Sequence, residues 1–135
     1  MATPTSDQLA ALVQVFNMAD GGDHGGAKVC QRFLLSLYNG ARFPFGLTDL
    51  RRLDLGMFEA CMRVLHMDYA PQCEVHVQLA IVLPKPQGLM SFIFERWGFD
   101  QRLRGRCKKA ALDDMQQHLR QVAAARREAA TAGAV

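Results

Sequence analysis

Apolar residues recur every three to four positions along most of this chain, the spacing that places them on one face of an α-helix. Capping residues and helix breakers flank these stretches. Thr5 with Gln8 resembles a capping box before the first stretch, and a later stretch has Asp54 before it and Pro71 after it. The pattern therefore predicts an all-α fold, a compact bundle of five to six helices. The predicted helices cover about 6–19, a segment ending at Asn39-Gly40, a segment between Asp54 and Pro71, 89–97 before Gly98, and a long C-terminal helix over about 101–130.

An extended aromatic-proline corner should separate the second helix from the third. Proline disfavours a helical conformation in the residue before it, so Phe43-Pro44-Phe45 is predicted to run extended, with both phenylalanines on the core. A short helical turn, capped by Thr48 or Asp49, should follow. The Asn39-Gly40 pair before the corner is well suited to a left-handed C-cap.

Residues 73–83 allow two interpretations. Apolar and polar side chains alternate there, which is a strand signal. The sequence offers no second strand-like segment, and an isolated strand would leave its backbone groups without hydrogen bonds. We favour a helix that begins after Pro71. A short strand that pairs with a second copy of the chain is the alternative.

The composition fits one compact domain. Half of the 135 residues are hydrophobic, and the predicted helical domain spans 1–130, with a frayed C-terminus at 131–135. The most apolar stretches, 75–83 and 89–97, are far shorter than the roughly 20 residues of a membrane span. The N-terminus lacks the basic start of a secretory signal, and the four cysteines show no paired spacing. We therefore expect a cytoplasmic protein with reduced thiols and no membrane contact.

Positive charge is concentrated toward the C-terminus. Residues 1–95 hold seven Lys/Arg against nine Asp/Glu, whereas residues 96–135 hold nine against four. Clustered cations can bind phosphates while a nearby aromatic ring, here Trp97 or Phe99, stacks on a base. In a helix, one face of this segment would carry Arg102, Arg106 and Lys109. The candidate contacts for a protein partner or a phosphate are Arg102, Arg104, Arg106, Lys108, Lys109, Arg51 and Arg52.

The predicted C-terminal helix carries a narrow apolar seam with seven-residue repeats, formed by Leu112, Met115, Leu119 and Val122. Such a seam suits docking along one edge of the domain or pairing with another helix. A homodimer could therefore form through 112–122 or, in the strand alternative, through 73–83.

Four potential soft metal ligands fall within sixteen residues: Cys61, His66, Cys73 and His76. Their spacing is irregular and lacks the close pairs of structural zinc sites, so we expect core cysteines and surface or hydrogen-bonded histidines, with no metal and no cofactor. No spacing in the sequence indicates a nucleophile with its base, or two carboxylates in one cleft. We therefore expect no enzymatic activity.

The segment from Leu37 to Asp54, LYNGARFPFGLTDLRRLD, resembles an uncharacterised bacterial family often carried by plasmids and integrative elements. The resemblance continues through Met67-Asp68, Glu74-Val75-His76 and Trp97-Gly98, and covers about residues 30–98. It implies a small accessory protein of a mobile element and brings no catalytic residues with it. Mobile elements carry many small proteins that bind a host or defence complex, including inhibitors of CRISPR systems, and others that bind nucleic acid.

These observations lead to two hypotheses about function. The first is a non-catalytic protein that inhibits or regulates a macromolecular complex by covering one of its surfaces, for example an anti-CRISPR-like inhibitor. The second is a nucleic-acid-binding accessory protein that uses the basic segment 102–109.

Overall fold

The computed structural model describes residues 3–86 and 88–133, and within them the chain is all-helical. Six α-helices and one 3₁₀ helix confirm the predicted fold class. Their bounds are α1 Ser6–Asp20, α2 Gly25–Tyr38, η1 Leu47–Arg52, α3 Leu55–Asp68, α4 Val75–Val82, α5 Leu89–Asp100 and α6 Lys109–Gly133.

Side-chain caps begin two of these helices where the sequence places them. Thr5 Oγ1 accepts a hydrogen bond from the Gln8 N–H at 3.1 Å, and the Gln8 side chain accepts in return from the Thr5 N–H at 3.0 Å. This reciprocal capping box satisfies amides that the first turn of α1 leaves free. Asp54 accepts from the Met57 N–H at 2.8 Å and so caps α3.

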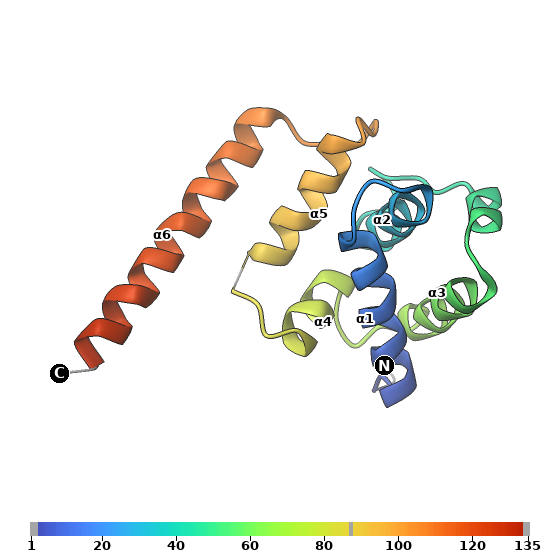
Figure 1. The fold of residues 1–135 in the computed structure, drawn as a ribbon, viewed down its shortest axis with the longest axis horizontal. Coiled ribbons are helices and arrows are strands. Elements are labelled where there is room, and N and C mark those ends of the chain that lie inside the picture. The colour runs from blue at the N-terminus through green and yellow to red at the C-terminus, as the bar shows by residue number, and fades with distance from the viewer. Residues whose placement is uncertain (1–2, 87, 134–135) are drawn as a thin grey trace.

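The core lies among the first five α-helices. α1 packs against α2 and α3, while α5 packs against α2 and α4. Each of the five helices contributes buried side chains to one apolar cluster, among them Leu12, Leu34, Val64, Leu79 and Phe94. α6 extends along α5 at one end of the molecule, and η1 with the start of α3 forms the opposite end (Figure 1). The two ends are therefore separate surfaces.

The end of α2 differs from the prediction in its geometry. Asn39 follows the last helical residue but is extended, with φ −158°, so the predicted left-handed cap is wrong. Its side-chain oxygen instead accepts from the Arg42 N–H at 3.2 Å, which turns the chain into the corner. Phe43 is buried, and Phe45 packs edge-on against Phe33 with ring centroids 5.8 Å apart, so both rings pack on the core as predicted.

Residues 75–82 form helix α4, so the strand alternative for 73–83 is wrong, and with it the pairing of two copies through such a strand. Val75 and Leu79 are buried, whereas Ile81 is exposed. Six of the eight residues of α4 are apolar, because Ala80 and Val82 occupy positions of the alternation where polar residues would be expected. The segment therefore contains a helical spacing of apolar residues, Val75 and Leu79, as well as the alternating one. The helix satisfies its backbone locally, and no partner strand is needed.

The last helix begins eight residues later than predicted, because 101–108 is a turn-and-loop segment and α6 begins at Lys109. The predicted common helical face of Arg102, Arg106 and Lys109 is therefore wrong. Within the seam, Leu112 is buried and the other three side chains are half-buried, along a helix that packs on α5. Homodimerisation through 112–122 stays a prediction. α6 extends to Gly133, and residues 134–135 lie outside the described residues.

Over the described ranges, no helix combines the length and the apolar character needed to cross a bilayer. α6, the longest helix, carries seven charged residues, and its leucine, methionine and valine side chains are those of the seam.

Asp68, the last residue of α3, should destabilise the fold at neutral pH. Burial, with a smaller effect of Glu74, raises its pKa from 3.8 to about 6, and the negative end of the helix dipole also disfavours an anion there. The folded state therefore binds this proton more tightly than the unfolded state, so the stability that the protonated group contributes is present at low pH and is lost as the pH rises through about 6.

We predict that Asp68→Asn raises the free energy of unfolding by about 1 kcal/mol at about pH 7.5, less than the full pKa shift implies because the side chain is half-buried. At about pH 3.5 the two proteins should be equally stable. Urea denaturation at both pH values checks this. An effect of the same size at both would contradict it.

Candidate functional site

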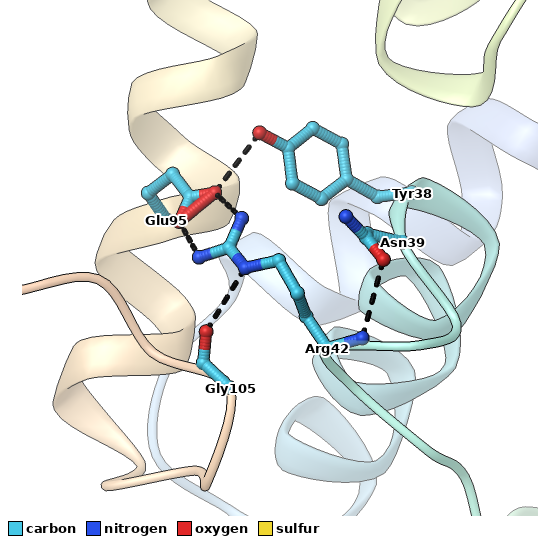
Figure 2. A network of polar contacts seen from close by, with 5 residues as sticks. All are labelled: Tyr38, Asn39, Arg42, Glu95 and Gly105. Atoms are coloured by element: carbon cyan, nitrogen blue, oxygen red, sulfur yellow. Dashed lines mark hydrogen bonds and ion pairs between the residues drawn. The ribbon is translucent and has the colours of Figure 1, made fainter.

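A buried carboxylate on α5 accepts hydrogen bonds from the end of α2 and from the turn that follows it. Glu95 is 5% exposed, and the Arg42 guanidinium donates to both of its oxygens, at 2.7 Å and 2.5 Å. The Tyr38 hydroxyl donates to the same carboxylate at 2.9 Å. Arg42 Nε also donates to the Gly105 carbonyl at 3.1 Å, as Figure 2 shows. One arginine thus joins the end of α2, helix α5 and the loop 101–108.

The members of this network have fixed charges near neutral pH. Burial raises the pKa of Glu95, but the hydrogen bonds from Arg42 and Tyr38 outweigh it, so the pKa lies below its ordinary value of 4.5. Burial and the hydrogen bond to Glu95 raise the pKa of Tyr38 to about 12. The hydrogen bond to Glu95 likewise raises the pKa of Arg42. None of these groups is poised to exchange a proton at neutral pH, so the network has the character of a structural support.

The predicted basic segment begins in the loop that this network fixes. The Leu103 N–H donates to the Gly98 carbonyl at 3.0 Å and the Arg106 N–H to the Leu103 carbonyl at 3.1 Å, so the loop folds back on the end of α5. Lys108 is exposed, and Lys109 pairs with Asp113 one turn along α6 at 3.4 Å. Exposed and half-buried side chains alternate in the loop: Arg102, Arg104 and Arg106 are exposed, whereas Leu103, Gly105 and Cys107 are half-buried.

Trp97 does not have the stacking role that its position beside the basic segment suggests. It is 7% exposed and packs against Phe16 and Phe94, with ring centroids 5.7 Å and 5.0 Å away. A ring enclosed in this way cannot reach a nucleobase. Phe99 is half-buried and lines a shallow cavity of about 140 Å³ between α5 and α6.

The four candidate metal ligands do not converge. Cys61 is fully buried, and its hydrogen bond with Cys30, together with burial, raises its pKa, which makes it a poor thiolate ligand. His66 is exposed on α3, and Cys73 precedes α4. The buried Nδ1 of His76 has no hydrogen-bond partner among the described residues. Across the described part of the chain, no three His, Cys, Asp or Glu side chains are close enough to share a metal ion.

The end of the molecule opposite α6 is formed by η1 and the start of α3 (Figure 1). In the sequence of this segment two exposed arginines lie between two exposed leucines. Leu47 is 75% exposed and Leu55 is 70% exposed. Arg51 and Arg52 are also exposed, and within residues 3–86 and 88–133 neither forms an ion pair. We call these four residues the leucine–arginine corner. Of these four residues, the sequence identified only Arg51 and Arg52 as candidate contacts. An exposed leucine at the start of a helix cannot be told from a core leucine by sequence pattern alone.

Comparison with known proteins places most of this helical core in one family. Residues 9–83, more than half of the chain, match the model of a family described as a family of unknown function (DUF7673). The chain belongs to the DUF7673 family. A search of curated proteins and a search of solved structures each gave no match. The matched part of this DUF7673 chain begins within α1 and extends just past α4, and it includes the leucine–arginine corner.

The segment beyond the family match is attached to it by side chains that sequence reasoning missed. Arg42 and Tyr38 lie in the matched part of this DUF7673 protein, whereas Glu95 and Gly105 lie beyond it. One feature of the sequence could have indicated this network: Glu95 is a carboxylate within the strongly apolar segment 89–97. A charge at such a position must be paired when the helix is buried.

Proposed function

We propose that this DUF7673 protein acts by binding another protein through the leucine–arginine corner. In this proposal it is a non-catalytic protein of a bacterial mobile element, which inhibits or regulates a host or defence complex by covering one of its surfaces, as an anti-CRISPR-like inhibitor would. The observation that carries the proposal is the exposure of Leu47 and Leu55 on either side of two arginines without ion pairs among the described residues.

The chemistry of the corner specifies the partner. Burying an exposed leucine contributes about 1.5–3 kcal/mol of favourable free energy, so Leu47 and Leu55 can act as anchors in apolar pockets. The arginines favour acidic residues around those pockets, which would guide the encounter and set its orientation. The partner surface should therefore be acidic, with apolar depressions. A nucleic acid would satisfy the arginines but not the leucines.

Residues next to those of the leucine–arginine corner contact the helices behind it. Asp49 of η1 pairs with Arg32 of α2 at 3.4 Å, and Phe45 packs against Phe33. Asp54 caps α3 immediately before Leu55. A surface that is already ordered loses little conformational entropy on binding, which supports its use as a recognition surface.

A specific observation also favours the second candidate, a nucleic-acid-binding accessory protein. Arg102, Arg104 and Arg106 are exposed together on the ordered loop 101–108. Phosphate contacts make affinity fall steeply with salt, whereas burial of apolar side chains does not. The two arginines of the leucine–arginine corner also lose affinity in salt, but less than a set of phosphate contacts would. A steep fall of affinity between two salt concentrations therefore favours the nucleic-acid candidate, and a shallow one favours the protein partner.

We predict that Leu47→Ser with Leu55→Ser weakens binding to the partner by about 30-fold or more, because hot-spot side chains typically contribute about 2 kcal/mol. Arg51→Glu with Arg52→Glu should weaken it by about tenfold or more through charge repulsion. The tagged chain is purified from cells of its source, the co-purifying protein is identified, and its affinity is measured by calorimetry.

Ile81→Ser on α4 is the matched control, because Ile81 is 66% exposed but lies outside the corner. All these side chains are exposed, so circular dichroism should show unchanged melting temperatures. Equal binding by the corner variants and the control would refute the proposed surface.

A further inference from the structure

Arginines from three separate segments line one pocket beside the basic loop. Arg32 comes from α2, Arg42 from the turn after α2, and Arg104 from the loop 101–108. The pocket has a volume of about 220 Å³, and none of its lining residues is acidic. Its remaining walls are apolar and are formed by Phe43, Pro44 and Leu103. Two of these arginines already have a carboxylate partner, Arg32 with Asp49 and Arg42 with Glu95, whereas Arg104 forms no ion pair among the described residues. The lining residues therefore offer three guanidinium groups, one of them without a counter-charge, and a small apolar surface.

The three guanidinium groups retain unused donors. Arg42 uses three of its five N–H groups, two toward Glu95 and one toward a backbone carbonyl. Arg32 donates one N–H to Gln101 at 2.9 Å and one to Asp49, its ion-pair partner, at 3.4 Å. Arg104 is exposed and forms no ion pair within the described ranges. An oxyanion in the pocket could therefore receive hydrogen bonds without breaking the existing network.

The backbone beside the pocket is held by close packing before any ligand binds. Gly105 packs so closely on the Arg42 backbone that a Cβ at this position would overlap its carbonyl. Arg102 has φ +55°, a left-handed conformation that is uncommon for residues other than glycine and persists only where the surroundings impose it. The loop therefore carries its arginines on an ordered backbone, which reduces the entropy lost when a ligand binds.

We propose that this pocket binds a phosphate group. The planar, forked donors of guanidinium groups match phosphate oxygens, and the apolar walls can contact the organic part of the ligand. Arg102 and Arg106 are exposed on the same loop and favour a ligand with further negative charges. The same chemistry is offered by the backbone of a single-stranded nucleic acid and by a free nucleotide. This proposal does not depend on the protein-binding function of the leucine–arginine corner.

The first test uses inorganic phosphate as the probe. The Nε–Hε signals of the arginine side chains are followed by NMR while phosphate replaces chloride at constant ionic strength. We expect saturable shifts for Arg104 and Arg32, and no more than a small linear drift for Arg126, an exposed arginine on α6. Shifts of the same size at Arg126 would overturn the proposal.

The second test identifies the source of the phosphate. A labelled single-stranded oligonucleotide and a nucleoside monophosphate are titrated by fluorescence anisotropy and calorimetry. Arg104→Ala is expected to weaken binding about tenfold and Arg104→Glu more, while Arg126→Ala changes it less than about twofold. Steeply salt-dependent binding of the oligonucleotide assigns the pocket to a nucleic-acid backbone, and binding of the monophosphate alone assigns it to a free nucleotide. Equal losses in the Arg104 and Arg126 variants, or no binding of either ligand, would overturn the proposal.

Discussion

Replacing Glu95 by alanine is expected to lower the free energy of unfolding by about 3 kcal/mol. The change removes the counter-charge of Arg42 and the acceptor of the Tyr38 hydroxyl, both of which are partly buried. Losing one partner of a buried pair is costly because the other charge stays out of water. The Arg42 side chain is 34% exposed and can be partly hydrated, which keeps the loss below the largest values known for such pairs. Urea denaturation followed by circular dichroism measures the effect.

Asp100→Ala is the matched control for Glu95→Ala. Asp100 lies on the same helix and pairs with Arg96, but both side chains are 53% exposed, so the change should cost less than about 0.5 kcal/mol. Glu95→Gln keeps the shape of the side chain and removes its charge, and should give an intermediate loss. If the Glu95 and Asp100 variants were destabilised equally, the network would not hold the loop and α5 in the way we describe.

The contribution of Glu95 also has a definite pH dependence. Its folded pKa lies below its ordinary value of 4.5, so the folded state binds the proton less tightly than the unfolded state. The stability from this pair is therefore fully present above about pH 4.5 and is lost as the pH falls through the folded pKa. The difference in stability between Glu95→Gln and the unchanged chain should shrink accordingly in acid.

Gly105→Ala is expected to destabilise the protein by about 2 kcal/mol, the second largest effect. A Cβ at this position would overlap the Arg42 carbonyl and lie 2.8 Å from the Arg42 Cβ. Because the obstacle is backbone, the loop 101–108 must move, and the hydrogen bond from Arg42 Nε to Gly105 is then lost. NMR of the variant should show shifts concentrated in this loop, and denaturation should show the loss of stability.

Gly25→Ala is the control, since a Cβ there has no neighbour within 4 Å in the described part of the chain and the position is the first of α2. Alanine at such a site should be neutral or slightly stabilising. Unchanged stability of Gly105→Ala would show that the loop is not packed on Arg42.

The features that the sequence predicted correctly are those that neighbouring residues determine. The Thr5 and Asp54 caps and the helical stripes depend on contacts within one turn, so spacing alone locates them. Gly98 shows the limit of that reasoning, because a glycine after an apolar stripe predicts a helix end. In the structure it lies inside α5, where a Cβ would come within 2.9 Å of the Phe43 ring.

The candidate sites depended on contacts that the sequence does not encode locally. The pairing of Arg42 with Glu95 joins residues 53 positions apart, and the same arginine donates to Gly105 in the loop 101–108. The spacing of apolar residues indicates neither contact. The exposure of Leu47 and Leu55 likewise depends on how η1 packs on α2 and α3 packs on α1, which the spacing of apolar residues does not specify. The sequence does identify Arg51, Arg52 and the arginines of the loop 101–108 as candidate contacts, because a charged residue type can be recognised without knowing its neighbours in space.

Site-specific cross-linking in cells tests the protein-binding function most directly. A photo-reactive phenylalanine analogue replaces Leu55 in one version of the chain and Ile81 in another, both highly exposed positions. We predict one discrete, nuclease-resistant protein adduct from position 55, which disappears when Arg51→Glu and Arg52→Glu are added, and no such adduct from position 81. An adduct from position 81 but not from 55, or one from 55 that survives the charge reversal, would contradict binding through the leucine–arginine corner.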